Sequence, residues 1–552
     1  MNVLVGREGI TYMALSRQQF DYIIVGGGSA GAVLAARLSQ RQSCNVCLIE
    51  AGKPDKNPFI HIPFGLSVLS RITSLNWGYS TQPQSALNNR CLFWPRGKTL
   101  GGSSAINAMC YIRGQDSDYD DWVKQGAAGW SFDEVLPWFK KAEKFEHGAS
   151  QRHGSDGPLS VESLRHVDPL SEAFVKSGAD EGLAKLEDFN LASRCGLGLY
   201  HVTQCGGQRC STAKAYLKPV LQRPNLTIVT GAHVEKINIE SGRATGVVIN
   251  VEGEVHTLQS REEVIVSAGA INSPHLLMLS GIGPEDALKR HRIPVIKALP
   301  GVGKNLQDHL DVIVQCRGKT RHGYALAPGK LLSYVKSAWQ YAVGRNGMLS
   351  SNIAEAGGFA CSSIASSDKP DLQFHFLPAI LKDHGRQNAL GYGYGLHVCN
   401  LYPQSRGSIT LQSADPAAPP LIDPAYLSSP KDMQTLLEGL KMARRLLHSE
   451  TMSPFLKHEL LPGEDVHDDE ALIQFIRQYA ETIYHPAGTC KMGAQDDEMA
   501  VLDSQFRVYG IEGLRVVDAS AMPTLVGGNT NAPVVMMAER AAAFIHEMPT
   551  PA

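Results

Sequence analysis

The sequence predicts an α/β protein, α+β overall, in which a doubly wound nucleotide-binding domain is joined to a second domain built on an antiparallel sheet and helices. Three observations predict this fold class. The apolar run at residues 22–25 passes directly into GGGSAG, and a second apolar run at residues 45–49 ends at Glu50. A third apolar run, residues 263–268, breaks into a glycine turn and a helix. Because 552 residues exceed one ordinary hydrophobic core, we expect two domains with a large shared interface.

Each glycine of the first motif has its own physical role. Gly26 permits the tight turn out of the strand, Gly28 lets a pyrophosphate approach the backbone, and Gly31 lets the following helix pack closely on the sheet. The N-terminus of that helix presents N–H groups to the phosphates. Glu50 follows about 20 residues later, where a carboxylate accepts ribose hydroxyls and disfavours a 2′-phosphate. Residues 20–52 therefore predict a Rossmann-like βαβ unit, although the motif does not distinguish FAD from NAD.

The residues that follow predict loops and then short strands. Residues 54–96 are rich in Pro and Asn and read mostly as loops, and residues 97–107 have the sequence GKTLGGSSAIN. The small residues of this stretch allow the backbone to lie against a planar ring or a phosphate, while its Ser and Asn side chains supply hydrogen bonds. Strands at 226–230, 234–239 and 245–251 predict a small antiparallel meander.

The remaining sequence predicts the domain boundaries. We expect residues 18–310 to form the main part of the nucleotide-binding domain, with excursions toward the substrate domain. Residues 311–478 mix strands, such as 371–376 and 407–411, with a helix at 431–448, and predict the substrate-binding domain. Residues 479–547 then return to the nucleotide-binding domain through a strand at 514–517 and a helix at 533–545.

Composition excludes several classes of function. The formal net charge of −2 and the absence of a long Lys/Arg run argue against nucleic acid as a partner. The 11 cysteines lack framework spacing, and for the Cys44–Cys47 pair we expect structural burial rather than redox or metal chemistry. No stretch approaches a membrane span or a signal peptide. We therefore expect a cytoplasmic protein without a metal, and peripheral contact with the inner face of the cytoplasmic membrane stays open. Met13 leads into the first strand, so residues before it are expected to be an extension or a misplaced start.

Six motifs, in order from about residue 20 to 545, resemble those of the glucose-methanol-choline (GMC) oxidoreductases. They are GGGSAG with Glu50, GKTLGGSS at 97–104, SAGAINSP at 267–274 running to SGIG at 280–283, GVGKNLQDH at 301–309, HPAGTC at 485–490 and GNTNAP at 528–533. The chain looks most like choline-dehydrogenase-like and quinone-linked bacterial alcohol dehydrogenases, which FWPRGK at 93–98, LQFHF at 372–376 and ETIYHP at 481–486 support. The resemblance implies FAD and alcohol oxidation by hydride transfer to the flavin.

Motif and resemblance together predict the residues that bind the cofactor. For Asp518, capping of the final helix is an alternative role. The predicted FAD-binding residues are Gly26, Gly28, Ser29, Gly31, Glu50, Ala51, Gly101, Gly102, Ser104, Asn107, Val234, Ala268, Asp518 and Ala519.

Two positions depart from relatives in the family. Ile106 stands where some choline oxidases carry a histidine that is bonded to FAD, and it has no nucleophilic atom. We therefore expect noncovalent FAD. Asp311 stands where choline-specific enzymes place a glutamate against the trimethylammonium group, and its side chain is shorter by one methylene. This departure weakens the case for choline.

The resemblance implies His485 and Asn529 as the catalytic pair. A neutral imidazole accepts a proton at pH 7, so His485 is the expected base for the alcohol hydroxyl. Asn529 is expected to donate a hydrogen bond to the developing alkoxide. We expect His309 to have a structural or flavin-side role and Tyr484 to shape the substrate side. For His61, His375 and His397, lining of the substrate cavity and surface or packing roles both stay open.

The sequence thus predicts FAD-dependent oxidation of primary, aliphatic alcohols to aldehydes, with electrons passed to a quinone or another non-oxygen acceptor. Choline dehydrogenase, an alcohol oxidase that uses oxygen, a hydroxynitrile lyase and an NAD-dependent enzyme are the alternatives. Substrate chain length, the physiological acceptor and the oligomeric state do not follow from the sequence.

Overall fold

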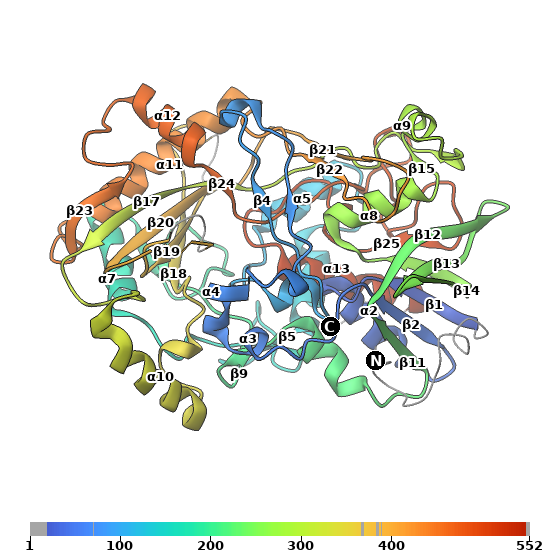
Figure 1. The fold of residues 1–552 in the computed structure, drawn as a ribbon, viewed down its shortest axis with the longest axis horizontal. Helices are drawn as coiled ribbons and strands as arrows, with labels where there is room; N and C mark the ends of the chain where they lie inside the picture. The colour runs from blue at the N-terminus through green and yellow to red at the C-terminus, as the bar shows by residue number, and fades with distance from the viewer. Residues whose placement is uncertain (1–18, 70, 366–368, 382–385, 388, 548–552) are drawn as a thin grey trace.

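The computed structural model describes residues 19–69, 71–365, 369–381, 386–387 and 389–547, so Met13 lies outside the described residues. Two sheets organise the molecule, one on the right and one on the left of Figure 1. The right-hand sheet has seven strands in the order β11-β2-β1-β14-β13-β12, with β25 also paired to β14. Their bounds are β1 Gln19–Val25, β2 Val46–Glu50, β11 Leu226–Thr230, β12 Ala232–Glu240, β13 Arg243–Val251, β14 Glu254–Val266 and β25 Leu514–Val516.

The long strand β14 joins two kinds of pairing within this sheet. Its first half pairs antiparallel with β13, and its second half pairs parallel with β1 on one side and β25 on the other. The prediction of a meander that begins at residue 226 is wrong for its first strand, because β11 pairs parallel with β2, from Leu226 opposite Val46 to Thr230 opposite Glu50. Most side chains of β11 are buried, as expected for a parallel strand covered on both faces.

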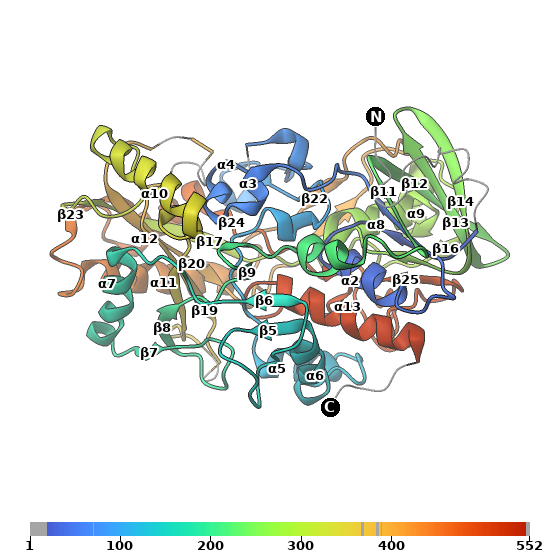
Figure 2. The same cartoon turned by 90° about the horizontal axis from the view of Figure 1, so that it is seen from below.

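Helices cover this sheet and bring both ends of the chain together. The helix α2, Ser29–Leu38, follows β1 directly and packs beside α13, Asn531–His546, near the C-terminus (Figure 2). The helix α8, Gly269–Leu279, follows β14 and packs on β12. The other helices of this half are α5 Asp116–Lys124, α6 Phe132–Ala142 and α9 Glu285–Arg290. The N-terminal ends of α2, α8 and α13 all lie where the apolar strands end.

The left-hand sheet is antiparallel, as predicted for the second domain. Its order is β18-β19-β20-β17-β23, with β24 also paired to β17. The helix α11, Pro430–His448, packs on β20 and β17. The other helices of this half are α7 Pro169–Ser177, α10 Leu331–Gly344 and α12 Asp469–Tyr479, and the strands are β17 Leu310–Gly318, β18 Ala356–Ala360, β19 Leu372–Leu377, β20 Gly393–Asn400, β23 Leu456–Leu461 and β24 Glu481–Thr482.

The two halves exchange segments of chain. The helix α7 and the strand β8, Gly196–Leu199, precede residue 311 but pack against β18 of the left-hand sheet. Conversely, β21 lies against α8. The remaining short elements are α3 Pro58–His61, α4 Leu66–Leu69, β3 Tyr79–Ser80, β4 Phe93–Trp94, β5 Glu143–Phe145, β6 Leu159–Val161, β7 Ala184–Leu186, β9 Gln204–Cys205, β10 Gln208–Arg209, β15 Ile282–Gly283, β16 Lys297–Ala298, β21 Ser408–Thr410 and β22 Leu421–Asp423.

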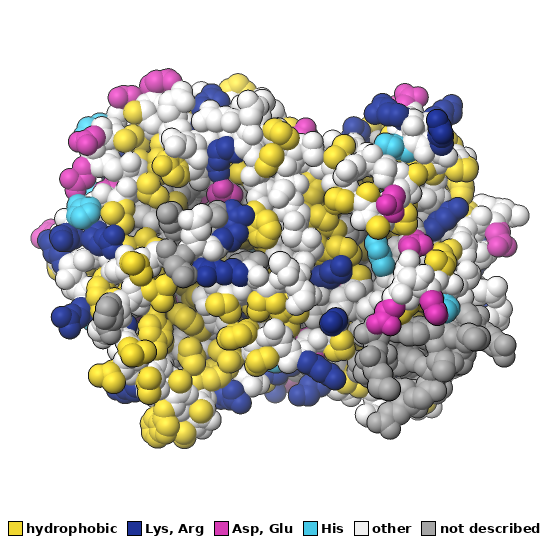
Figure 3. All heavy atoms as spheres, in the orientation of Figure 1, with side chains coloured by type: hydrophobic (Ala, Val, Ile, Leu, Met, Phe, Trp, Pro, Cys, Tyr) yellow, Lys and Arg dark blue, Asp and Glu magenta, His cyan; other side chains and the backbone are white. Residues whose placement is uncertain are grey.

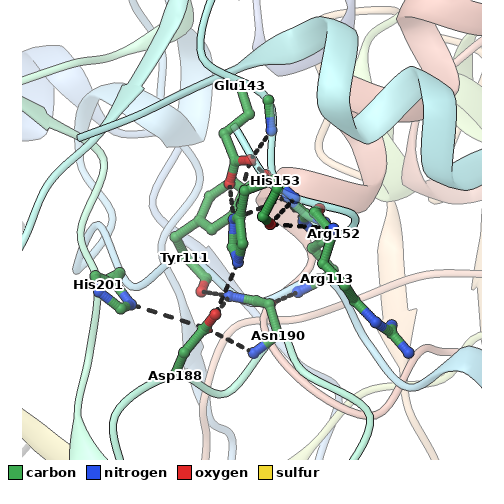
Figure 4. Close-up of polar contacts among 10 residues, drawn as sticks. Tyr111, Arg113, Glu143, Arg152, His153, Asp188, Asn190 and His201 are labelled. Atoms are coloured by element: carbon green, nitrogen blue, oxygen red, sulfur yellow. Dashed lines mark hydrogen bonds and ion pairs between the residues drawn. The ribbon is translucent and has the colours of Figure 1, made fainter. Parts of the chain in front are cut away.

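A buried polar cluster ties β5 to the loop that follows β7 (Figure 4). His153 lies between Glu143, at 3.1 Å, and Asp188, at 2.7 Å, and Arg113 pairs with Glu143 at 2.6 Å. Burial opposes the ionisation of Asp188, but the hydrogen bonds from His153 and the Asn190 backbone, with the nearby histidine charges, together outweigh it and lower the pKa of Asp188 to about 2. Burial likewise disfavours protonated His153, yet both carboxylates raise its pKa above the ordinary value. The cluster is therefore a buried network of charged groups that joins β5 to the loop after β7.

Candidate active site

A single cavity of about 1120 Å³ brings the predicted site residues together from both halves of the molecule. It is lined by the loop after β1, the segments around residues 50 and 102–110, the N-terminus of α8, and β19 and β20 of the other sheet. The predicted residues that line it are Gly26, Gly28, Ser29, Glu50, Ala51, Gly102, Asn107, Val234, Ala268, His485, Asp518, Ala519 and Asn529. Gly31, Gly101 and Ser104 do not line it.

The three residues outside the lining build the loops that do line the cavity. A Cβ atom on Gly31 would lie 1.8 Å from the carbonyl oxygen of Gly26, so only glycine lets α2 start against this turn. The Ser104 hydroxyl donates to the carbonyl oxygen of Gly101 at 2.6 Å and accepts from the backbone N–H of Thr212 at 3.0 Å. These contacts hold the second glycine loop in its turn.

The turn at Gly28 leaves room for a ligand against the backbone. A Cβ atom built on Gly28 would meet nothing closer than the Cα atom of Gly102, at 3.9 Å. Gly26 has a φ of +102°, and a Cβ atom there would lie 2.5 Å from the carbonyl oxygen of Ser267. Gly26 therefore has a steric reason within the fold, whereas Gly28 faces open space. This difference is the one that a phosphate-binding turn requires.

The N-terminal ends of three helices point N–H groups at the cavity. Gly28, Ala268 and Thr530, the N-cap residues of α2, α8 and α13, provide no side-chain cap, although Asp518 already accepts from the first N–H of α8, that of Gly269. The Ser29 hydroxyl donates to the side-chain oxygen of Asn531 at 2.8 Å and so joins α2 to α13 at this point. Helix N-termini without a side-chain cap attract anions through their N–H groups and dipoles. The residues present therefore fit the pyrophosphate of a dinucleotide such as FAD.

Glu50 is held by the backbone on both of its oxygens. One oxygen accepts from the N–H of Gly27 at 2.8 Å, and the other accepts from the N–H of Gly52 at 2.7 Å. Because a carboxylate offers about four lone pairs, acceptor capacity remains for ribose hydroxyls. Burial raises the pKa of Glu50 to about 7, although the two backbone hydrogen bonds oppose the rise.

Asp518 does not cap the final helix, which corrects that alternative. It caps the short 3-10 turn Ala519–Ala521, accepting from the N–H of Ser520 at 2.8 Å. Its other oxygen accepts from the N–H of Gly269 at 2.9 Å and from the hydroxyl of Ser273 at 2.5 Å, at the start of α8. Asp518 therefore fixes the chain after β25 to the N-terminus of α8, because the two parallel strands end side by side.

The hydrogen bonds of His309 determine the tautomer of His485. His309 Nε2 lies 3.1 Å from the carbonyl oxygen of Leu401, which can only accept, so neutral His309 carries its proton on Nε2. Its Nδ1 lone pair then faces His485 Nδ1 at 3.0 Å, which must be the donor. His485 Nε2 consequently carries a lone pair, and Asn529 Nδ2 lies 3.2 Å away as a donor to it. His485 is therefore a base whose Nε2 lone pair is directed toward Asn529.

The backbone around His485 is fixed from two sides. Its N–H donates to Asp308 at 2.7 Å. Tyr484, the preceding residue, has a φ of +72°, a region that bulky residues seldom adopt. Arg96 donates to the carbonyl oxygen of Tyr484 at 2.7 Å, and the N–H of Tyr484 donates to the Thr482 hydroxyl at 2.8 Å. Several contacts thus maintain one unusual backbone conformation next to the base.

Asn529 is oriented by Gln373 from the other sheet. Gln373 Nε2 donates to Asn529 Oδ1 at 3.1 Å, so the Asn529 amide nitrogen faces His485. Gln373 lies on β19, next to His375, which lines the cavity. The catalytic pair predicted from the sequence is therefore assembled from the last segment of the chain and held in orientation by the second domain.

Burial keeps the histidines of the site neutral. Burial, with smaller contributions from His309, His375 and Arg96, lowers the pKa of His485 well below its ordinary value. Burial also lowers the pKa of His309 to about 3 and that of His375 to about 4. At neutral pH these imidazoles are uncharged, which agrees with the tautomers that the hydrogen bonds assign.

Of the three histidines with open roles, two reach the cavity. His375 and His397 line it, whereas His61 hydrogen-bonds the carbonyl oxygen of Asp55 at 2.7 Å and does not. His397 Nδ1 is paired with the carboxylate of Asp311, which is 1% exposed and does not line the cavity. Ile106 and Tyr484 do line it.

Three further residues support the site, and the sequence did not predict their roles, although Asp308 and Gln373 stand inside the motifs GVGKNLQDH and LQFHF. Gln373 orients Asn529, and Asp308 holds the backbone of His485, although Asp308 stands in the QDH sequence beside His309. Arg209 is 1% exposed and donates to the carbonyl oxygen of Asn107 at 2.6 Å and to its side-chain oxygen at 2.8 Å. Burial lowers the pKa of Arg209 to about 9. Arg209 stands in none of the motifs, and only its hydrogen bonds to Asn107 in the structure connect it with the site.

The cysteines and carboxylates give no sign of a metal centre within the described part of the chain, where no group of three or more His, Cys, Asp or Glu could hold an ion. Cys47 is a buried residue of β2, and burial raises the pKa of its thiol above the ordinary value. Cys44 is half-buried.

Comparison with known proteins gives two matching family models, both described as GMC oxidoreductase, at residues 20–311 and 403–538. An alcohol dehydrogenase (acceptor) of Pseudomonas putida is 49% identical over 530 residues, which cover 95% of each chain. An oxygen-dependent choline dehydrogenase of Rhizobium johnstonii is 42% identical over 533 residues, 96% of this chain and 95% of that one. A solved formate oxidase variant of Aspergillus oryzae, studied for FAD modification, has a TM-score of 0.89 at 26% identity and covers 96% of this chain and 98% of its own.

Proposed function

Because the chain belongs to the GMC oxidoreductase family, as its motifs predict, we propose that it oxidises primary, aliphatic alcohols to aldehydes and passes the electrons to a quinone or another non-oxygen acceptor. The family and its flavoprotein neighbours imply FAD, and the glycine turns and helix N-termini described above fit it. When bound, FAD supplies the acceptor for the hydride of the alcohol carbon. We expect it to be held noncovalently, because Ile106 offers no atom for a bond.

The observation that carries this proposal is the lone pair on His485 Nε2 beside the amide N–H of Asn529. An alcohol oxygen that enters between the two side chains replaces the hydrogen bond from Asn529 to His485: it gives its proton to His485 Nε2 and accepts a hydrogen bond from the Asn529 amide. The negative charge that develops on the oxygen is then stabilised before the carbon loses its hydride. His309 accepts from the Nδ1–H of His485 throughout and so keeps the reactive nitrogen directed at the substrate.

The lining of the cavity favours an apolar substrate over choline. Asp311 does not face the cavity, since its carboxylate is paired with His397. Toward the second domain the lining includes Ile353, Leu377 and Ile380, which would cover an alkyl chain.

The test is anaerobic mixing of the purified holoenzyme with a series of primary alcohols, followed by the absorbance of oxidised flavin. We expect bleaching that is slowed by about 10²- to 10⁴-fold in His485→Ala, the range that general-base catalysis supplies. His467→Ala, an exposed histidine outside the cavity, is the matched control and should reduce at the wild-type rate. Unchanged bleaching in His485→Ala at equal flavin content would remove His485 from the mechanism.

Reoxidation of the bleached enzyme separates the acceptors. A short-chain quinone should restore the oxidised spectrum much faster than dissolved oxygen does. The alternatives give different results: an oxidase reoxidises fastest in oxygen, and a hydroxynitrile lyase stays yellow with every alcohol yet releases cyanide from a cyanohydrin. A protein purified without flavin that forms NADH would indicate the NAD-dependent alternative.

A further inference from the structure

The helix α10 exposes a continuous apolar stripe. Five of its large apolar side chains are more than 60% exposed, and four of them recur every four residues, which places them on one face of the helix. Figure 3 shows this apolar surface as the yellow area at its lower left, over α10. The residues, called the α10 face below, are Leu331 (68%), Leu332 (83%), Val335 (61%), Trp339 (67%) and Val343 (72%).

The opposite side of α10 is anchored, so the exposed stripe belongs to a folded helix. Ser337 and Tyr341 are buried, and the Tyr341 hydroxyl donates to the carbonyl oxygen of Gly207 at 3.1 Å. Exposed apolar area on this scale on a folded element marks a surface that meets another apolar phase. Single exposed apolar residues elsewhere, such as Val255 on β14, lack this continuity.

The charges of the chain segment that carries α10 indicate whether this other apolar phase is a membrane or a protein. In a chain with nearly equal numbers of acidic and basic residues, residues 312–354 contain no Asp or Glu at all. The same stretch carries six basic residues: Lys336 lies within α10, Lys330 and Arg345 flank it, and Arg317, Lys319 and Arg321 lie in β17 or just after it. An amphipathic helix with apolar residues on one face and Lys and Arg around it is the pattern of interfacial helices, which bind at the boundary between anionic headgroups and acyl chains.

A second copy of the chain is a poorer occupant. A symmetric dimer would place the same surface against itself, and therefore the same basic stretch against itself. Like charges brought together in this way repel, and nothing in residues 312–354 supplies the opposite sign. An anionic bilayer, by contrast, complements both the apolar and the basic parts of the surface.

We propose that the α10 face is a membrane-docking surface that inserts at the headgroup boundary of an anionic bilayer. No helix of the described residues is long and apolar enough to cross a membrane, so attachment here is peripheral. Leu326, which is 47% exposed, also lines the cavity, and it forms a β-bridge with the 74% exposed Leu390. Docking therefore turns one mouth of the cavity toward the lipid. If the proposed function holds, apolar alcohols dissolved in the bilayer enter there.

The test is cosedimentation of the holoenzyme with vesicles of phosphatidylcholine alone and of phosphatidylcholine with one quarter phosphatidylglycerol. We expect binding that requires the anionic lipid and weakens with salt, and a blue shift of tryptophan emission on the anionic vesicles that is lost in Trp339→Phe. Val335→Asp and Trp339→Asp should each reduce the bound fraction by about tenfold or more, because they bring a charge to the apolar boundary.

Val255→Asp is the matched control, since Val255 is 60% exposed but lies on the other sheet, and it should bind as wild type does. Oxidation of a short water-soluble alcohol should be equal in all variants, so a failure of docking is separable from a failure of the proposed function. Wild-type protein that stays in the supernatant, or Asp variants that bind like wild type, would overturn the proposal. So would a wild-type dimer that Val335→Asp splits, because the α10 face would then be a contact between copies.

Discussion

The proton on one nitrogen of His309 decides which nitrogen of His485 carries a proton and which carries the lone pair. The carbonyl oxygen of Leu401 keeps that proton on Nε2. The remaining lone pair of His309, on Nδ1, then accepts a hydrogen bond from the Nδ1–H of His485. The chain thus sets a tautomer with neutral groups alone, because burial keeps both imidazoles uncharged. A carboxylate in place of His309 would favour the imidazolium form of His485.

The role of His309 can be tested with two substitutions. His309→Leu removes the acceptor for the Nδ1–H, so His485 is released to the other tautomer. We expect the rate of flavin reduction to fall by about 10²-fold, the lower end of the general-base contribution, with little change in KM. His309→Gln, whose side-chain oxygen accepts from Nδ1–H, should recover a substantial part of the rate. Equal losses in both variants would indicate that His309 only fills space.

The pH dependence of the reaction should follow the lowered pKa of His485. Only the neutral imidazole accepts a proton, and a lowered pKa moves the loss of that form to lower pH. The rate of flavin reduction should therefore be constant from about pH 8 to about pH 6. A histidine at the ordinary value of about 6.5 would lose about three quarters of the rate over this range. Stopped-flow reduction at constant ionic strength measures it, and half-loss near pH 6.5 would contradict the assignment.

At the scale of elements, the turn between β1 and α2 contains one glycine that the packing of the fold requires and another that only a ligand would require. Gly31 packs against the carbonyl oxygen of Gly26, whereas Gly28 faces open space with a φ of −79° that other residues adopt readily. The two glycines belong to the same motif and differ in what a methyl group would meet.

This difference predicts two distinct outcomes. In the flavin-free protein, Gly28→Ala should change the free energy of unfolding by less than about 0.5 kcal/mol, yet it should sharply lower the FAD retained on purification. Gly31→Ala should cost about 1–3 kcal/mol or more in the same measurement, because the new methyl group overlaps backbone. Thermal unfolding with and without FAD distinguishes the two. Normal FAD retention by Gly28→Ala would show that the pyrophosphate does not lie against Gly28.

The elements differ in how far the sequence could predict them. The apolar runs and the glycine motif predict the unit of β1, α2 and β2, because the contacts of this unit are between residues close together in the chain. The partner of β11 does not, because strand propensity carries no information on whether residues 226–230 pair with their successor or with β2. Likewise the motifs name His485 and Asn529, but Gln373 meets Asn529 from 156 positions away, a pairing that only the packing of the two sheets creates.

At the scale of the whole molecule, a buried ion pair joins the two ends of the chain. Arg37 of α2 donates to both oxygens of Glu539 of α13, at 2.8 and 2.7 Å, and the Tyr216 hydroxyl donates to the same carboxylate at 2.8 Å. The Glu539 side chain is fully buried and that of Arg37 is 20% exposed. The carboxylate therefore satisfies three donors from two distant segments.

Breaking this pair should destabilise the protein strongly. Glu539→Leu leaves the Arg37 charge without its partner in a largely buried place, which typically costs about 3–5 kcal/mol. Urea unfolding measures the change, and Arg37→Met combined with Glu539→Leu should recover part of it. Glu285→Ala, which breaks the exposed pair with Lys289, is the control and should cost less than about 1 kcal/mol. A Glu539→Leu variant as stable as the control would mean that the pair does not hold the chain ends together.

The hydrogen bond from Ser29 to Asn531 spans 502 positions, and this has a consequence for synthesis. A ribosome adds about 5–20 residues per second, so roughly 25–100 seconds separate the emergence of the first glycine turn from that of α13. During this interval the nascent chain has the predicted phosphate-binding turn but lacks α13, which packs beside α2 in the folded protein. We therefore expect cofactor binding to come late in synthesis, and a product that terminates before residue 531 lacks the helix that packs beside α2 at the cavity.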